Sequence, residues 1–218
     1  MLMGVGTASA YATPTTTGTS AVQNNQISKD DVRGFFLHHG VEPRVADRLI
    51  HDFENGKVPD SLGGVEPVSS QELTADGQAF TKLVYPDGSV AVVGHETGSS
   101  SRLRDTAQCK VAVGSGYRTF TNCQVYNNAG FYSMQFYANF TLLRGAPDRI
   151  TWHGAPACAA TWPANCDTPY YAAGQTMEYP PSVAWVSYQM RYTTPINTST
   201  ARLTLKVGND NYSSSYEN

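Results

Sequence analysis

The fold is decided by residues 131–142, which read Phe-Tyr-Ser-Met-Gln-Phe-Tyr-Ala-Asn-Phe-Thr-Leu (FYSMQFYANFTL). From the second of these residues onward, every other side chain is apolar: Tyr132, Met134, Phe136, Ala138, Phe140 and Leu142. A period of two places these side chains on one face of a β-strand, whereas an amphipathic helix would need steps of three and four. The stretch therefore predicts a strand with one buried face.

The same alternation recurs elsewhere in the C-terminal half of the chain. Apolar residues alternate in 183–192 and 201–207, a short strand is expected at 149–153, and Gly114-Ser115-Gly116 predicts a turn between two further strands. Roughly seven short antiparallel strands joined by turns are typical of a β-sandwich or a small barrel. We therefore predict a mainly β protein, with an antiparallel β-sandwich or small barrel in a disulfide-stabilised domain over residues 102–218.

The N-terminal half predicts an α+β module over residues 28–97. Ser28 is a typical N-cap, Gly40 and Gly56 are typical residues after a helix end, and Pro43 suits the first turn of a second helix. Further along, Pro86-Asp87-Gly88 predicts the turn of a β-hairpin. The module is thus expected to be a helical hairpin followed by a β-hairpin, with a domain boundary at 98–101.

The four cysteines are Cys109, Cys123, Cys158 and Cys166. Their even number and the lack of a Cys-x-x-Cys motif favour disulfides over a zinc or thioredoxin-type site. Local pairing, Cys109 with Cys123 and Cys158 with Cys166, is the simplest of the possible connectivities. Four buried free thiols are the alternative.

The start of the chain predicts export. Ala8-Ser9-Ala10 and Ala10-Tyr11-Ala12 both fit the small-x-small pattern of a signal-peptidase site. We therefore interpret residues 1–12 as the remnant of a signal peptide whose basic beginning lies upstream of Met1. Residues 13–27 form a polar, low-complexity segment, expected to be a flexible tail that could add a strand to another protein's sheet. A flexible cytosolic N-terminus is the alternative.

Composition and charge exclude several classes of protein. The chain has 15 Lys and Arg against 18 Asp and Glu, so its net charge of −3 does not favour nucleic acid as a partner. The helical hairpin also lacks the basic cluster of a DNA-binding helix-turn-helix. The sequence contains no apolar run of the roughly 20 residues that a membrane-spanning helix needs.

Several short motifs resemble small secreted proteins of Gram-positive bacteria, and of actinobacteria in particular. In the N-terminal half these are ENGKVPDS at 54–61, PVS at 67–69 and YPDGSV at 85–90; in the C-terminal half they are GSGY at 114–117, TNC at 121–123 and FYANF at 136–140. The resemblance implies secretion and a disulfide-containing β-domain, without a defined catalytic activity. A weaker similarity in kind is to small β-rich adaptors of extracellular toxin particles.

The sequence contains no recognisable catalytic, metal or cofactor motif. His-Glu-x-x-His, Gly-x-Ser-x-Gly, the Walker lysine motif and the dinucleotide-binding glycine pattern are all absent. The scattered carboxylates of the C-terminal half could still bring two acids together in space, as a glycosidase requires. We therefore predict no cofactor and favour a non-enzymatic protein, with an extracellular hydrolase of cell-wall or carbohydrate polymers as the alternative.

Aromatic residues around the second pair of cysteines predict a binding loop. Trp162, Tyr170 and Tyr171 lie in a segment rich in Pro and small residues, where exposed rings would offer large contact area at low entropic cost. Trp152 and Trp185, on predicted strands, are expected in the core. The leading hypothesis is a secreted binding or adaptor protein that engages a protein, glycan or surface partner outside the cell, for example within an extracellular toxin assembly. A lectin is a further alternative.

Overall fold

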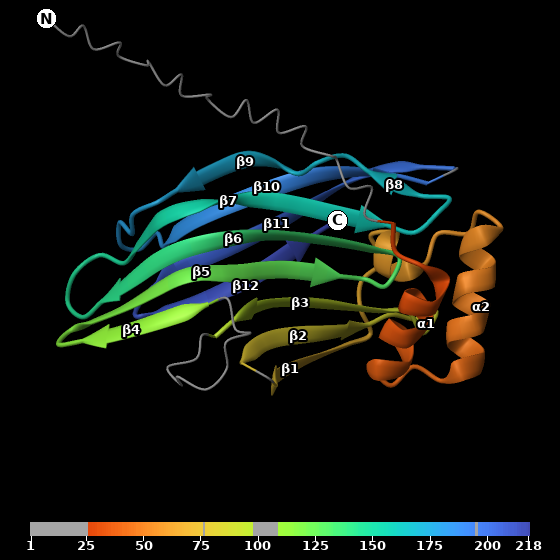
Figure 1. Ribbon diagram of the computed structural model, residues 1–218, viewed down its shortest axis with the longest axis horizontal. Coiled ribbons are helices and arrows are strands. Elements are labelled where there is room, and N and C mark those ends of the chain that lie inside the picture. Colours follow the sequence, from red (N-terminus) through yellow and green to blue (C-terminus); the bar gives the residue numbers. More distant parts are fainter. Residues whose placement is uncertain (1–25, 76, 98–108, 195) are drawn as a thin grey trace, which may run out of the picture.

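The computed structural model describes residues 26–75, 77–97, 109–194 and 196–218. Two helices are followed by two antiparallel sheets that pack face to face (Figure 1). The prediction of a mainly β fold is confirmed. Of the two predicted forms, a sandwich and a small barrel, the two sheets form a sandwich, and the first sheet also includes strands from the N-terminal half. The predicted signal-peptide remnant, most of the predicted tail and the predicted boundary at 98–101 lie outside the described residues.

The two helices begin and end where the sequence predicts. In α1 (Lys29–His38) the Ser28 side chain accepts the backbone N–H of Asp31, and the Asp31 carboxylate accepts that of Ser28. This capping box satisfies two backbone donors that a helix start leaves unpaired. Pro43 opens α2 (Pro43–Glu54), and Gly56, at a φ of +84°, follows its end. A short 3₁₀ turn, η1 (Asp60–Leu62), leads to the first strand.

The first sheet has seven strands in the order β1-β2-β3-β5-β6-β7, with β4 also pairing with β5. Its members are β1 (Ser69–Ala75), β2 (Gln78–Val84), β3 (Val90–Glu96), β4 (Lys110–Gly114), β5 (Tyr117–Asn128), β6 (Tyr132–Leu143) and β7 (Arg149–Ala160). The second sheet has five strands in the order β12-β11-β10-β8, with β9 also pairing with β10. Its members are β8 (Asn165–Cys166), β9 (Tyr170–Gln175), β10 (Ala184–Thr193), β11 (Thr198–Gly208) and β12 (Asn211–Glu217).

The core lies between the two sheets. All six apolar residues predicted to share one face of the decisive strand are buried on β6, each at most 1% exposed. Rings from the two sheets meet there: those of Phe136 and Tyr188 are 4.7 Å apart, and those of Tyr132 and Tyr192 are 5.0 Å apart. The residues that alternate as apolar in the sequence are therefore the ones buried inside the sandwich.

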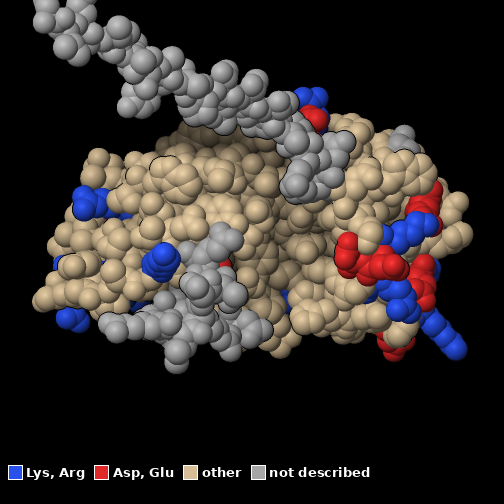
Figure 2. All heavy atoms as spheres, in the orientation of Figure 1, with Lys and Arg blue, Asp and Glu red and all other residues tan. Residues whose placement is uncertain are grey.

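The helical hairpin covers one end of this core, and Phe131 is a ring that contacts both helices. Phe131, just before β6, stacks on Phe53 of α2 at 4.3 Å and meets Phe36 of α1 edge to face at 5.5 Å. Because β3 pairs directly with β5, the segments predicted as two domains contribute to one sheet and one hydrophobic core. Charged side chains gather at the helical end of the molecule (Figure 2).

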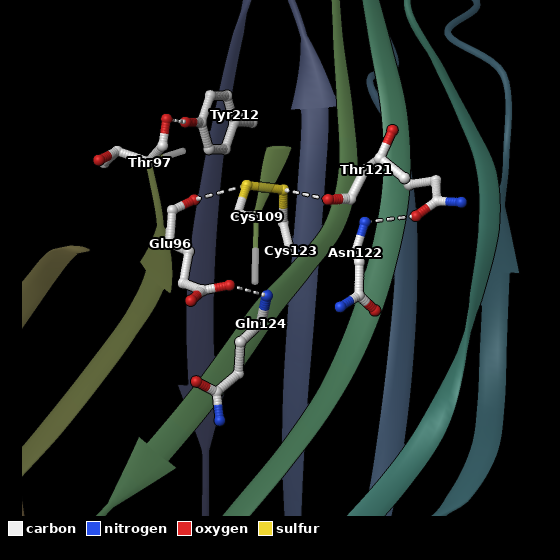
Figure 3. Close-up of a disulfide and its surroundings, with 9 residues drawn as sticks. Glu96, Thr97, Cys109, Thr121, Asn122, Cys123, Gln124 and Tyr212 are labelled. Carbon is white, nitrogen blue, oxygen red and sulfur yellow. Dashed lines mark hydrogen bonds between the residues drawn. A yellow bond between two sulfur atoms is a disulfide. The ribbon is translucent and has the colours of Figure 1, made fainter. Parts of the chain in front are cut away.

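Both disulfides join the cysteines that local pairing favoured. Cys109 to Cys123 links the start of β4 to the middle of β5, and Cys158 to Cys166 closes the turn between β7 and β8. Near the first bridge, the Glu96 carboxylate accepts the backbone N–H of Gln124 at 2.9 Å, which connects β3 to β5 (Figure 3). All four cysteines of the sequence are therefore oxidised.

Candidate binding surface

The three aromatic residues predicted to bind a partner are all exposed, but they do not form one cluster. Trp162, Tyr170 and Tyr171 are 66%, 56% and 48% exposed. Trp162 lies in the turn that the Cys158–Cys166 disulfide closes, whereas the two tyrosines begin β9 and pair with the middle of β10. Within the described part of the chain, no ring contact joins Trp162 to either tyrosine.

The prediction that Trp152 is in the core is wrong, since this side chain is 44% exposed. The reason is a β-bulge: Phe140 of β6 pairs with Ile150, but Asn139 pairs with Trp152, so Thr151 is an extra residue in β7. An extra residue reverses the alternation of faces along a strand. Trp152 is therefore turned to the outer face of the sheet. Trp185, the other tryptophan predicted in the core, is only half-buried.

Four exposed apolar side chains are close together in the sequence, on and just after β9, which is an edge strand of the second sheet. They are Tyr170 and Tyr171 on β9, and Met177 and Tyr179 after it, which are 40% and 61% exposed. We call this segment the 170–179 edge. Residues 168–177 contain no Lys, Arg, Asp or Glu. Tyr179 belongs to the aromatic cluster of the sequence around the second disulfide but was not among the predicted binding residues, and Met177 was not predicted at all.

Aromatic neighbours hold the beginning of the 170–179 edge in place. Tyr171 stacks on His153 of β7 at 4.9 Å, and Nδ1 of His153 lies 2.9 Å from the Tyr188 hydroxyl. Burial lowers the pKa of His153, so its ring is neutral at neutral pH. The Tyr170 hydroxyl donates to Oε1 of Gln189 at 3.3 Å. Both tyrosines thus have an exposed ring and a defined orientation.

A buried pair of carboxylates anchors the other end of the 170–179 edge. Glu178, between Met177 and Tyr179, accepts the backbone N–H groups of Asn209 and Asp148, each at 3.0 Å. Asp148 in turn accepts those of Leu143 at 2.6 Å and Asp210 at 2.9 Å. Burial raises the pKa of Asp148, with the nearby charge of Glu178 acting in the same direction.

These two carboxylates are not arranged for catalysis. Asp148 is 1% exposed and Glu178 is 8% exposed, and each of their four oxygens accepts a backbone N–H. A glycosidase needs its two acids at the substrate, where they can give and take protons. The pair instead ties together three turns of the sandwich. Among residues that the structure describes, no group of three His, Cys, Asp or Glu side chains could hold a metal ion.

Comparisons with known proteins show no family for this chain. No protein-family model matches the chain, and no curated protein matches it. A solved structure that it resembles is the hypothetical protein lmo2686 from Listeria monocytogenes EGD-e, with a TM-score of 0.37 and 17% sequence identity over 68% of this chain and 94% of that one. The resemblance to secreted actinobacterial proteins stays a prediction. No described helix is both long and apolar enough to cross a membrane.

Proposed function

We propose that this chain is an exported, non-catalytic binding or adaptor protein that engages a protein partner through the 170–179 edge. The observation that carries the proposal is the exposure of Tyr170, Tyr171, Met177 and Tyr179 in a segment whose one charged residue, Glu178, is buried. Exposed apolar patches on a domain mark interaction sites, and these four side chains share one edge strand and the segment that follows it. Aromatic residues such as Tyr are also enriched among the hot-spot residues that contribute most of the binding energy at such sites.

The fixed geometry of the segment supports this proposal. The His153 stack, the Gln189 hydrogen bond and the buried Glu178 hold the exposed side chains in place before any partner arrives. Binding through an ordered surface loses less conformational entropy than binding through a flexible loop.

Two observations support export. Both disulfides brace the β-sandwich, and structural disulfides persist in oxidising compartments such as the cell exterior. The small-x-small pattern at 8–12 suits cleavage by a signal peptidase. Mass measurement of the exported protein should find all four cysteines oxidised and an N-terminus at Tyr11 or Thr13, after the second alanine of either motif. Four reduced thiols would contradict export through an oxidising compartment.

Affinity purification from the native culture medium tests the binding proposal. The edge variant carries Tyr170→Ala, Tyr171→Ala and Tyr179→Ala, and the matched control is Tyr117→Ala, which removes a tyrosine that is 46% exposed on the β4–β5 hairpin. The wild type and the control should retain the same partner, identified by mass spectrometry, and the edge variant should lose it. Recovery of the same partner with all three proteins would exclude the 170–179 edge.

A further inference from the structure

The outer face of the seven-stranded sheet carries aromatic rings and side-chain amides in two neighbouring rows. Gln124 of β5 pairs with Tyr137 of β6, and in the next row Tyr126 of β5 pairs with Gln135 of β6. These four side chains point away from the core, because residues that alternate with them, such as Val125 and Phe136, are completely buried. The rows therefore form a surface across the strands.

Trp152 extends this surface onto β7, where a glycine gives its ring room to lie along the sheet. A Cβ atom added to Gly154 would come within 2.9 Å of Cζ2 of Trp152, so the indole occupies the space above this glycine. Gly154 pairs with Tyr137, which brings the indole beside the first row. With 44% of its surface exposed, Trp152 presents a ring to solvent while resting on the backbone.

Tyr126 lies over a glycine in the same way at the other end of the surface. A Cβ atom added to Gly94 of β3 would meet the Tyr126 hydroxyl oxygen at 2.7 Å. That hydroxyl donates to Oε1 of Gln78 at 3.2 Å, which fixes the direction of the ring. Two rings are thus held flat against the sheet by neighbouring backbone.

The side-chain amides between the rings can both donate and accept hydrogen bonds. Nε2 of Gln124 donates to Oε1 of Gln135 at 2.6 Å, which holds the two side chains together. This bond leaves Oε1 of Gln124 as an acceptor and Nε2 of Gln135 as a donor for a ligand. A hydroxyl group, which both donates and accepts, can pair with either of them.

Around these rings and amides, β6 and the part of β7 from Ile150 onward contain no charged residue. Neither residues 119–143 nor residues 150–166 contain Lys, Arg, Asp or Glu. Arg149, the first residue of β7, is exposed on the same face, where it pairs with Thr141 of β6. The neighbouring Glu96 is 9% exposed, and its carboxylate accepts the backbone N–H of Gln124. The surface therefore neither attracts nor repels a charged ligand strongly.

We propose that the belt formed by Gln124, Tyr126, Gln135, Tyr137 and Trp152 binds an uncharged glycan chain. A sugar ring has an apolar C–H face that packs on an aromatic ring, and its hydroxyls pair with amides. Protein interfaces are instead enriched in Arg, which none of the five belt positions carries; Arg149 lies beyond them, at the start of β7. The inference is independent of the proposed function, because the belt shares no residue with the 170–179 edge.

Calorimetric titration with defined oligosaccharides tests the belt. The probes are cellohexaose, xylohexaose and chitohexaose, with hexagalacturonate as the charged counterpart. We expect the wild type to bind at least one neutral probe, and Trp152→Ala to weaken that binding about tenfold or more. Gly154→Ala keeps the indole but pushes it off the sheet, so it should weaken binding as well. Tyr117→Ala, the exposed control on the β4–β5 hairpin, should bind as the wild type does.

The results also separate the two proposals. The edge variant should keep its glycan binding, and Trp152→Ala should keep its protein partner. No binding to any neutral probe, stronger binding of hexagalacturonate than of the neutral probes, or equal binding by wild type and Trp152→Ala would each overturn the belt. Circular dichroism and thermal unfolding of every variant establish that lost binding is not lost folding, since Trp152 is exposed and outside the core.

Discussion

Acidification should destabilise this protein through His95, which lies on β3 and faces the second sheet. Its Nδ1 is 3.1 Å from the Ser214 hydroxyl, and its ring is 4.9 Å from that of Tyr212. Burial lowers the pKa of His95 from 6.5 to about 4. Between these two values the unfolded chain binds more protons than the folded one, so the free energy of unfolding falls as the pH falls.

The size of the effect follows from the two pKa values. At about pH 7.5 His95 is neutral in both the folded and the unfolded chain, so its lowered pKa does not change the free energy of unfolding there. At about pH 5 it is almost fully protonated in the unfolded chain and almost neutral in the folded one. The expected loss between these conditions is about 2 kcal/mol from His95 alone. His39, whose pKa burial also lowers to about 4, adds to the decline of the wild type.

Urea unfolding of the wild type and His95→Gln, followed by tryptophan fluorescence at both pH values, isolates this contribution. Because His39 is present in both proteins, its effect cancels in the comparison. The stability of His95→Gln should decline by about 2 kcal/mol less than that of the wild type. Equal declines in the two proteins would refute the assignment of the buried, neutral state to His95.

Three further predictions concern the sandwich. Phe131→Ala should cost about 3–5 kcal/mol in guanidinium unfolding, because it removes the ring that joins both helices to the core, and a cost below about 1 kcal/mol would contradict this role. Replacing Cys109 and Cys123 together by alanine should cost about 3 kcal/mol, measured by urea unfolding, because the bridge closes a loop with a sequence separation of 14; an unchanged stability would be the contrary result. Glu178→Gln should cost about 2 kcal/mol in urea unfolding, because an amide nitrogen replaces a buried oxygen that accepts a backbone N–H. The control Glu217→Gln, at an exposed position, should change the free energy of unfolding by no more than about 0.5 kcal/mol. Similar costs for both variants would reject the anchoring role of Glu178.

Helices with a capping residue and strands with one buried face could be predicted from the sequence. The decisive strand differs from β6 by a single residue at each end, and Ser28, Gly40, Pro43 and Gly56 mark the two helices correctly. The strands β1 and β12 were not predicted. β1 is almost entirely exposed and β12 is mostly polar, so neither shows the alternation that a half-buried strand requires. These two segments become strands by hydrogen bonding to β2 and β11.

The candidate binding surfaces, too, could be predicted from the sequence only in part. Exposure of Trp162, Tyr170 and Tyr171 could be anticipated, but the outward turn of Trp152 depends on a bulge that only its pairing with β6 reveals. The amino-acid sequence by itself determined which faces are apolar, where the helices begin and end, and which cysteines are close along the chain, because these properties depend on neighbouring residues. Only the tertiary structure decided which rings lie together and which carboxylates are buried, because strand register and sheet packing bring distant residues into contact.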